Sequence, residues 1–172
     1  KTPLEIWFNY WIKRVFDIIF SFLVILFVMS WLYPLLALLI KRQSKGPVLF
    51  KQLRTGKKNQ SFWCYKFRSM QINAISDSQQ AQKNDVRVTA IGKFMRRTSI
   101  DELPQFFNVL LGDMSVVGPR PLLMEYLPLY NKEQAKRHDV RPGMTGHAQV
   151  NGRNAISWEE KFKLDTWYVE NQ

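Results

Sequence analysis

Apolar residues are concentrated in one long N-terminal run, and the rest of the chain mixes short apolar and polar stretches. Between Val15 and Ile40, 22 of 26 residues are apolar, and Asp17 is the only charged one. As a continuous helix this run would measure about 39 Å, which exceeds the ~30 Å hydrocarbon core of a bilayer. The pattern therefore predicts a helical segment that lies in a membrane.

Two features of this run predict that it enters and leaves the membrane on the same side. Pro34 lacks a backbone N–H and crowds the preceding turn, so we expect the helix to break or bend there. Basic residues flank both ends, and positive charge favours the cytoplasmic face. They are Lys13 and Arg14 at one end and Lys41, Arg42 and Lys45 at the other. We therefore predict a re-entrant membrane helix within residues 1–45. The alternative, which composition alone favours, is a tilted spanning helix with a proline kink.

The remaining residues, 46–172, predict a single cytoplasmic region. Two stretches rich in β-branched and aromatic residues, 46–54 and 61–70, predict a β-hairpin closed by a polar loop. Helical signals follow at 90–98, 101–112, 122–138 (interrupted at Pro128) and 157–171. The last has Ser157 and Glu160 in capping-box spacing and aromatic residues that suit a membrane interface. The predicted fold class is α+β and mainly helical, with a re-entrant membrane hairpin, a small β-hairpin and amphipathic interfacial helices.

The charge of the chain points to a phosphate-bearing partner. The formal net charge is +11, and the stretch from Arg42 to Arg97 holds 13 basic residues against two acidic ones. Such a field attracts nucleic acid, anionic lipid or a nucleotide, and charge alone does not choose among them. Cys64 is the only cysteine, which excludes an intramolecular disulfide and a cysteine-based zinc site.

Asp101 and Glu102 form an adjacent acidic pair at the start of a predicted helix. Ser99 and Glu102 have the spacing of a capping box, and Asp101 could itself be the N-cap, so a purely structural role is one interpretation. The second interpretation is a functional site. Several arginines occur in stiff or glycine-containing stretches nearby: Arg96, Arg120 (between two prolines), Arg141 and Arg153. Together with the acidic pair they could hold a Mg²⁺-bound diphosphate.

Three longer motifs carry a resemblance to a known family. They are D-E-L-P-Q-x-x-N-V (101–109), G-D-M-S-x-V-G-P-R-P (112–121) and R-P-G-x-T-G-x-A-Q-V-N-G-R-N (141–154). In this order they resemble the bacterial sugar transferase family, the monotopic phosphoglycosyl transferases, over the chain from about Lys13 onward. The ending N-G-R-N-A-I-S-W is most similar to the small single-domain members that act on UDP-linked N-acetylated sugars.

The resemblance implies transfer of a sugar 1-phosphate from a UDP-sugar, an N-acetylated hexose by this likeness, to undecaprenyl phosphate, with release of UMP. It implies that Asp101 is the nucleophile and a Mg²⁺ ligand, that Glu102 is its partner, and that the reaction passes through a covalent phosphosugar. The residues that it implies as phosphate and nucleotide contacts are Lys66, Arg96, Arg120, Arg141 and Arg153. Residues 46–172 are then a catalytic region on the cytoplasmic face of the bacterial inner membrane, with membrane lipid and no nucleic acid as partners. Two alternatives remain: the catalytic part of a longer transferase, and a non-catalytic basic module that binds membranes.

Overall fold

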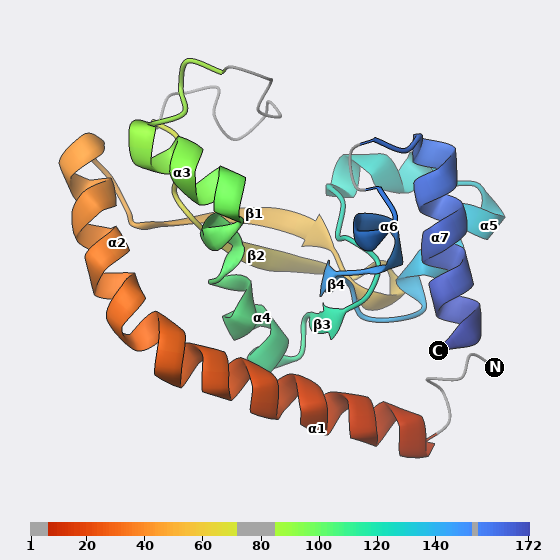
Figure 1. The fold of residues 1–172 in the computed structure, drawn as a ribbon. Helices are drawn as coiled ribbons and strands as arrows, with labels where there is room; N and C mark the ends of the chain where they lie inside the picture. Colours follow the sequence, from red (N-terminus) through yellow and green to blue (C-terminus); the bar gives the residue numbers. More distant parts are fainter. Residues whose placement is uncertain (1–6, 72–84, 153–154) are drawn as a thin grey trace.

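A computed structural model describes residues 7–71, 85–152 and 155–172 of the 172-residue chain. A long, bent N-terminal helix runs along one side, a β-hairpin crosses the middle, and shorter helices and a second small sheet pack around it (Figure 1). The predicted α+β, mainly helical fold is confirmed in these features.

The apolar run forms one continuous helical path with a widened turn inside it. Helix α1 spans Trp7–Val24, a π-helical turn spans Ile25–Met29, and α2 spans Ser30–Gln43. Figure 1 shows the path bending between the two helices, so that α1 passes below α4 and β3 while α2 rises beside α3. The run Phe8–Gln43 is long and apolar enough to cross a membrane by length and composition, and most of its side chains are exposed.

The helix does not break at Pro34 as predicted, because Pro34 lies inside α2. The irregular turn lies earlier in the chain. A proline ring crowds the carbonyl four residues before it, which here belongs to Ser30. The widened turn ends at Met29, immediately before that residue. The crowding is thus relieved one turn upstream of the proline, as a π-bulge can do. Helices α1 and α2 are connected by this turn without a break, and the re-entrant hairpin stays a prediction.

Polar contacts fix α1 to the rest of the protein. The Asp17 carboxylate is 2% exposed and accepts hydrogen bonds from the Ser115 hydroxyl at 3.1 Å and the Val116 amide at 3.0 Å. The Arg14 guanidinium donates to the carbonyls of Val109 and Leu110 at 2.6 and 2.8 Å. Both carbonyls lie in the last turn of α4, where the helix dipole favours a cation, and the Val109 carbonyl also accepts from the Gly112 amide at 3.1 Å. The apolar helix is therefore held in a defined place against the rest of the protein.

The predicted β-hairpin is present as β1 (Leu49–Thr55) and β2 (Ser61–Phe67), which pair antiparallel with Leu49 opposite Phe67 and Thr55 opposite Ser61. The polar turn between them contains Lys58 and Asn59 in the left-handed backbone region. Phe67 joins a core with Met95 of α3 and Leu36 and Ile40 of α2. The apolar helix and the hairpin thus share one buried core.

The next segments are short helices and a second sheet. Helix α3 spans Ala90–Thr98, a 3₁₀ turn spans Ile100–Glu102, and α4 spans Gln105–Leu111 and ends at Gly112 (φ 99°). Strands β3 (Ser115–Val117) and β4 (Gly143–Thr145) pair in parallel. A short helix, α6 (His147–Val150), follows β4.

The helix predicted over 122–138, with an interruption at Pro128, is present only as three short helical pieces. The segment forms a 3₁₀ stretch at Met124–Leu129, helix α5 at Lys132–Ala135 and a 3₁₀ turn at Lys136–His138. Pro128 removes a helical donor, and Asn131 begins a new helix with its own capping box.

The C-terminal helix is confirmed as α7, Trp158–Asn171, with the predicted capping box between Ser157 and Glu160. It packs on the rest through buried Tyr168 and Val169, and the Tyr168 hydroxyl donates to the Val117 carbonyl at 2.7 Å. Helix α7 is thereby joined to the small parallel sheet.

Candidate active site

The acidic pair lies in the 3₁₀ turn that connects α3 to α4. Ser99 ends α3 in the left-handed conformation (φ 58°), and its side chain makes no cap for the turn that follows. Pro104 is the N-cap of α4, so Asp101 does not cap that helix. Both capping interpretations are therefore wrong. The chain reverses at Ser99, and the turn is closed by a hydrogen bond from the Glu102 amide to the Ser99 carbonyl (3.1 Å). The two carboxylates are left for other contacts.

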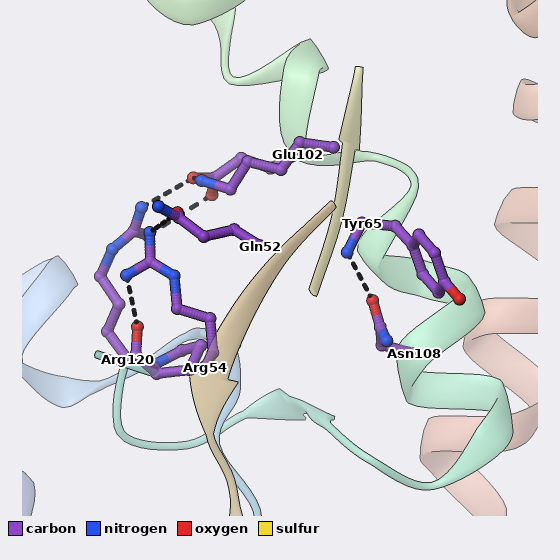
Figure 2. A network of polar contacts seen from close by, with 8 residues as sticks. Gln52, Arg54, Tyr65, Glu102, Asn108 and Arg120 are labelled. Carbon is purple, nitrogen blue, oxygen red and sulfur yellow. Dashed lines mark hydrogen bonds and ion pairs between the residues drawn. The ribbon is translucent and has the colours of Figure 1, made fainter. Parts of the chain in front are cut away.

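Glu102 binds two cations that come from separate elements. Its Oε1 atom accepts from Lys66 Nζ on β2 at 2.8 Å. The same atom accepts from Arg120 Nη2 at 2.7 Å, and its Oε2 atom lies 3.4 Å from Arg120 Nη1 (Figure 2). Burial by itself would raise the pKa of this carboxyl, but the charges and hydrogen bonds of Lys66 and Arg120 lower it to about 2. Glu102 is therefore an ionised carboxylate that holds both cations in place.

Asp101 is 8% exposed and lies on the wall of a pocket of about 850 Å³. Burial raises the pKa of its carboxyl above the ordinary value, and the positive charges of Lys66 and Arg96 oppose the rise. Within the described residues, no cation lies within ion-pairing distance of Asp101. Among the described residues, Asp101 is thus the acid of the pair that has no cation bound to it, whereas Glu102 has two.

Most charged side chains on the pocket wall are basic. They are Lys51, Arg54, Lys66, Arg68, Arg96, Arg120, Arg137 and Lys161. The acidic ones are Asp101 and Asp165, and Asp165 is already paired with Arg137 at 2.7 Å. A pocket with this excess of positive charge is suited to an anionic ligand with several phosphate oxygens.

The structure brings together most of the residues predicted for the site. Lys66, Arg96, Arg120 and Asp101 all line the pocket. Arg141 lies elsewhere: its guanidinium donates to the Gly112 carbonyl at 2.6 Å and to the Tyr10 hydroxyl at 3.0 Å, beside α1. Arg153 is outside the described residues. Substrate contacts by these last two arginines stay predictions.

Asn108 fixes the hairpin relative to the acidic pair. This residue of α4 is fully buried, and its Oδ1 accepts from the Tyr65 amide at 3.0 Å (Figure 2). Its Nδ2 donates to the Trp63 carbonyl at 2.7 Å. Both partners are on β2, and Tyr65 directly precedes Lys66. The amide therefore sets the distance between β2 and the turn that carries Glu102.

Several pocket residues were not predicted from the sequence. Gln52 and Arg54 alternate along β1 and so share one face of the hairpin, a signal that strand periodicity could have provided. Arg137 and Asp165 form a buried ion pair between segments 28 residues apart. Nothing in their local sequence indicates that pairing.

The donor set permits a Mg²⁺ ion only in company with a substrate. Among the described residues, no group of three or more His, Cys, Asp or Glu side chains could hold a metal ion. Mg²⁺ is commonly bound through one or two carboxylates, with substrate phosphates and water completing its six oxygen ligands. The Asp101 carboxylate on a wall of basic side chains fits that arrangement.

Comparison with known proteins gives one consistent family. Residues 8–172 match the family described as bacterial sugar transferase. The sugar transferase EpsL of Bacillus subtilis (strain 168) is 50% identical over 165 residues, which cover 93% of this chain and 78% of EpsL. The UDP-glucose:undecaprenyl-phosphate glucose-1-phosphate transferase of Klebsiella pneumoniae is 48% identical over 91% of this chain. An undecaprenyl-phosphate N-acetylgalactosaminephosphotransferase of Aeromonas hydrophila, named for UDP-N-acetylgalactosamine, is 46% identical over 93%.

These relatives differ in length. The chain spans 36% of the Klebsiella protein and 39% of the Aeromonas protein, but most of EpsL. The shared part contains the acidic pair, the hairpin and the proline-flanked Arg120. The chain belongs to the bacterial sugar transferase family.

Proposed function

We propose that this chain transfers a sugar 1-phosphate from a UDP-sugar to undecaprenyl phosphate, releasing UMP and initiating glycoconjugate assembly. The observation that carries the proposal is the difference in ion pairing between the two acids. Glu102 is fully engaged by Lys66 and Arg120, whereas Asp101 faces a basic pocket without an ion-pair partner among the described residues. The relatives named for undecaprenyl-phosphate sugar transfer support the same reaction.

In the first step an Asp101 oxygen attacks the sugar-side phosphorus of the donor. A bond forms between that oxygen and phosphorus, and the bond from phosphorus to the bridging oxygen breaks, so that UMP leaves with the bridging oxygen. We assign neutralisation of the charge on the diphosphate to Arg120, Lys66 and Arg96, which line the same pocket as Asp101. The product on the enzyme is a phosphosugar bound to Asp101 as an acyl phosphate.

In the second step an oxygen of the lipid phosphate attacks the same phosphorus. The bond to Asp101 breaks, the carboxylate is regenerated, and the polyprenyl-diphosphate sugar leaves. Two substrates that repel one another are thus handled in turn. A bound Mg²⁺, held by Asp101 and the substrate phosphates, would supply further charge neutralisation.

Glu102 has a positional role in this proposal. Its Oε1 atom already accepts hydrogen bonds from both Lys66 and Arg120, which orients the two cations toward the pocket. A lipid phosphate has its second pKa near 6 and is largely ionised at neutral pH, so its attack does not require a strong base.

The membrane arrangement that fits the reaction is a re-entrant helix at the cytoplasmic face of the bacterial inner membrane. Support comes from the bend between α1 and α2, the exposed apolar side chains and the basic residues at both ends. Single variants Phe8→Cys and Lys45→Cys, labelled from one side with an impermeant maleimide, test this topology. Labelling of both from the cytoplasmic side supports it, and labelling from opposite sides contradicts it.

The donor is proposed to be a UDP-hexose. The N-acetylated form is supported by the Aeromonas relative, while other relatives are named for glucose and galactose. Release of UMP from a panel of UDP-sugars, with undecaprenyl phosphate and Mg²⁺ present, tests both the reaction and the sugar. Absence of release from every UDP-sugar, with retained binding to anionic liposomes, would favour the non-catalytic basic module.

A second form of the proposal is that the chain is the catalytic part of a longer transferase. It is favoured by the relatives of which this chain matches about a third. Recovery of full turnover by the 172-residue chain alone would show that no further segment is required for the reaction.

A further inference from the structure

Arg54 extends from strand β1 toward the side of Glu102 on which Arg120 lies. Its Nη2 atom donates to Gln52 Oε1 at 2.6 Å, and its Nη1 atom lies 3.3 Å from the Pro121 carbonyl (Figure 2). The two contacts come from the same strand and from the proline-flanked turn that carries Arg120. The guanidinium is thereby held on the pocket wall by two neutral acceptors.

Arg54 differs from Lys66 and Arg120 in its ion pairing. In the ranges that the structure describes, no acidic oxygen lies within 4 Å of its guanidinium. The nearby carboxylate of Glu102 is shared by Lys66 and Arg120. This part of the pocket therefore holds three cations around one anion.

The surroundings make this imbalance unfavourable without a ligand. Burial lowers the pKa of the Arg54 guanidinium, and the positive charge of Arg120 acts in the same direction. For Arg120, burial is outweighed by Glu102, which raises its pKa. A partly buried guanidinium beside another cation is stabilised when an anion binds between them.

We propose that Arg54 and Arg120 together form a phosphate-binding fork that grips a non-reacting phosphate oxygen of a substrate. This inference rests on the proposed function and adds a residue to its binding site. The ligand chemistry is a phosphate ester, whose oxygens match the planar donors of guanidinium groups. Two substrates could supply it, the diphosphate of the UDP-sugar and the phosphate of the polyprenyl lipid.

The Arg54 side chain can be replaced without removing a backbone hydrogen bond of the β-hairpin. Arg54 pairs with Phe62 through backbone atoms, and the strand hydrogen bonds do not use its side chain. Arg54→Met retains an unbranched side chain and removes the charge, and Arg54→Lys keeps the charge but lacks the planar fork. Arg97→Met is the matched control, because Arg97 is an exposed α3 residue that does not line the pocket.

The test begins with inorganic pyrophosphate as the probe, titrated calorimetrically into the detergent-solubilised full chain. We expect Arg54→Met to weaken pyrophosphate binding by about tenfold or more, which corresponds to one lost charge-assisted hydrogen bond. Arg54→Lys should show a smaller loss, and Arg97→Met should match the wild type. Equal pyrophosphate affinity of the wild type and both Arg54 variants would overturn the fork, as would failure of the wild type to bind pyrophosphate.

Steady-state kinetics then identify the source of the phosphate. A raised KM for the UDP-sugar in Arg54→Met assigns the fork to the donor diphosphate, and a raised KM for undecaprenyl phosphate alone assigns it to the lipid. Unchanged values of both KM and kcat would contradict the proposal. Because the pyrophosphate titration needs no turnover, loss of binding in Arg54→Met supports the fork even if no UDP-sugar is consumed, a result that would refute only the transferase assignment.

Discussion

The Glu102 carboxylate and the Arg120 guanidinium are joined by a 2.7 Å ion pair that connects the turn after α3 to the Pro-Arg-Pro turn after β3. Lys66 of β2 binds the same carboxylate oxygen, so three segments distant in sequence meet at one atom. Replacement of Glu102 by Gln removes the negative charge that holds both cations. We expect kcat/KM to fall by about 10- to 100-fold and the free energy of unfolding by about 2 kcal/mol.

Glu133→Gln is the matched control for that variant. Glu133 pairs with Lys136 at 2.8 Å, but its side chain is 62% exposed. Exposed pairs contribute little, so we expect turnover to be unchanged and stability to change by less than about 0.5 kcal/mol. Equal behaviour of the two variants in UMP release and urea unfolding would refute the positional role of Glu102.

Asn108 is the second residue whose replacement should lower the free energy of unfolding. Asn108→Ala leaves the Tyr65 amide and the Trp63 carbonyl without their partner in a buried site. Each unsatisfied buried group costs about 1–3 kcal/mol, so we expect a loss of roughly 2–4 kcal/mol in urea denaturation followed by tryptophan fluorescence. Asn171→Ala, which removes an exposed hydrogen bond to the Trp167 carbonyl, should lose less than about 1 kcal/mol. Similar losses in both would contradict the role assigned to Asn108.

The ion pair between Arg137 and Asp165 is buried, with side chains 3% and 4% exposed. Removal of one partner leaves an uncompensated buried charge, so Asp165→Leu or Arg137→Met alone should destabilise by about 3–5 kcal/mol. The double variant removes both charges and should recover much of that loss. A double-mutant cycle measured by chemical denaturation checks this, and additive losses would show that the two residues do not act as a pair.

His138 makes stability depend on pH. It is 7% exposed and packs edge-on against Tyr130, and burial together with the charge of Arg137 lowers its pKa from 6.5 to about 4. Between these values the unfolded chain binds more protons than the folded one, so stability falls as pH decreases. The loss is absent above about pH 6.5, reaches about 2 kcal/mol by pH 5 and is complete below pH 4.

Unfolding free energies at pH 7.5 and 5 for the wild type and for His138→Phe test this dependence. The difference between the two proteins isolates His138 from the carboxyl groups, whose titration they share. Glu102 adds its own loss only as the pH falls below about 4.5, toward its pKa of about 2. An identical pH dependence in both proteins would contradict the assignment to His138.

The sequence predicted elements best where local signals agreed with the fold. The capping box at Ser157 and the turn after Leu111 at Gly112 are both present, and the two aromatic stretches do form a hairpin. Those signals act within a few residues. The left-handed Ser99, by contrast, overrode an equally good capping pattern, because the chain has to reverse there to bring Glu102 to Lys66.

The site was only partly predictable for the same reason. The family resemblance implied Asp101, Lys66, Arg96 and Arg120 as site residues, and all four line the pocket. Arg54 and Arg137 are placed there by strand pairing and by a buried ion pair, which depend on contacts across the fold. Arg141 looks like another phosphate ligand by sequence, but its guanidinium binds the carbonyl of Gly112 at the end of α4.

The most direct test of the central claim is detection of a phosphosugar on Asp101. The enzyme is incubated with the UDP-sugar and Mg²⁺ in the absence of undecaprenyl phosphate, then examined by intact-mass spectrometry. We predict a mass increase equal to one sugar phosphate in the wild type, its localisation to Asp101 by peptide mapping, its disappearance when undecaprenyl phosphate is added, and no increase in Asp101→Asn. Turnover without any adduct, or an adduct that persists in Asp101→Asn, would contradict the assignment of Asp101 as the nucleophile.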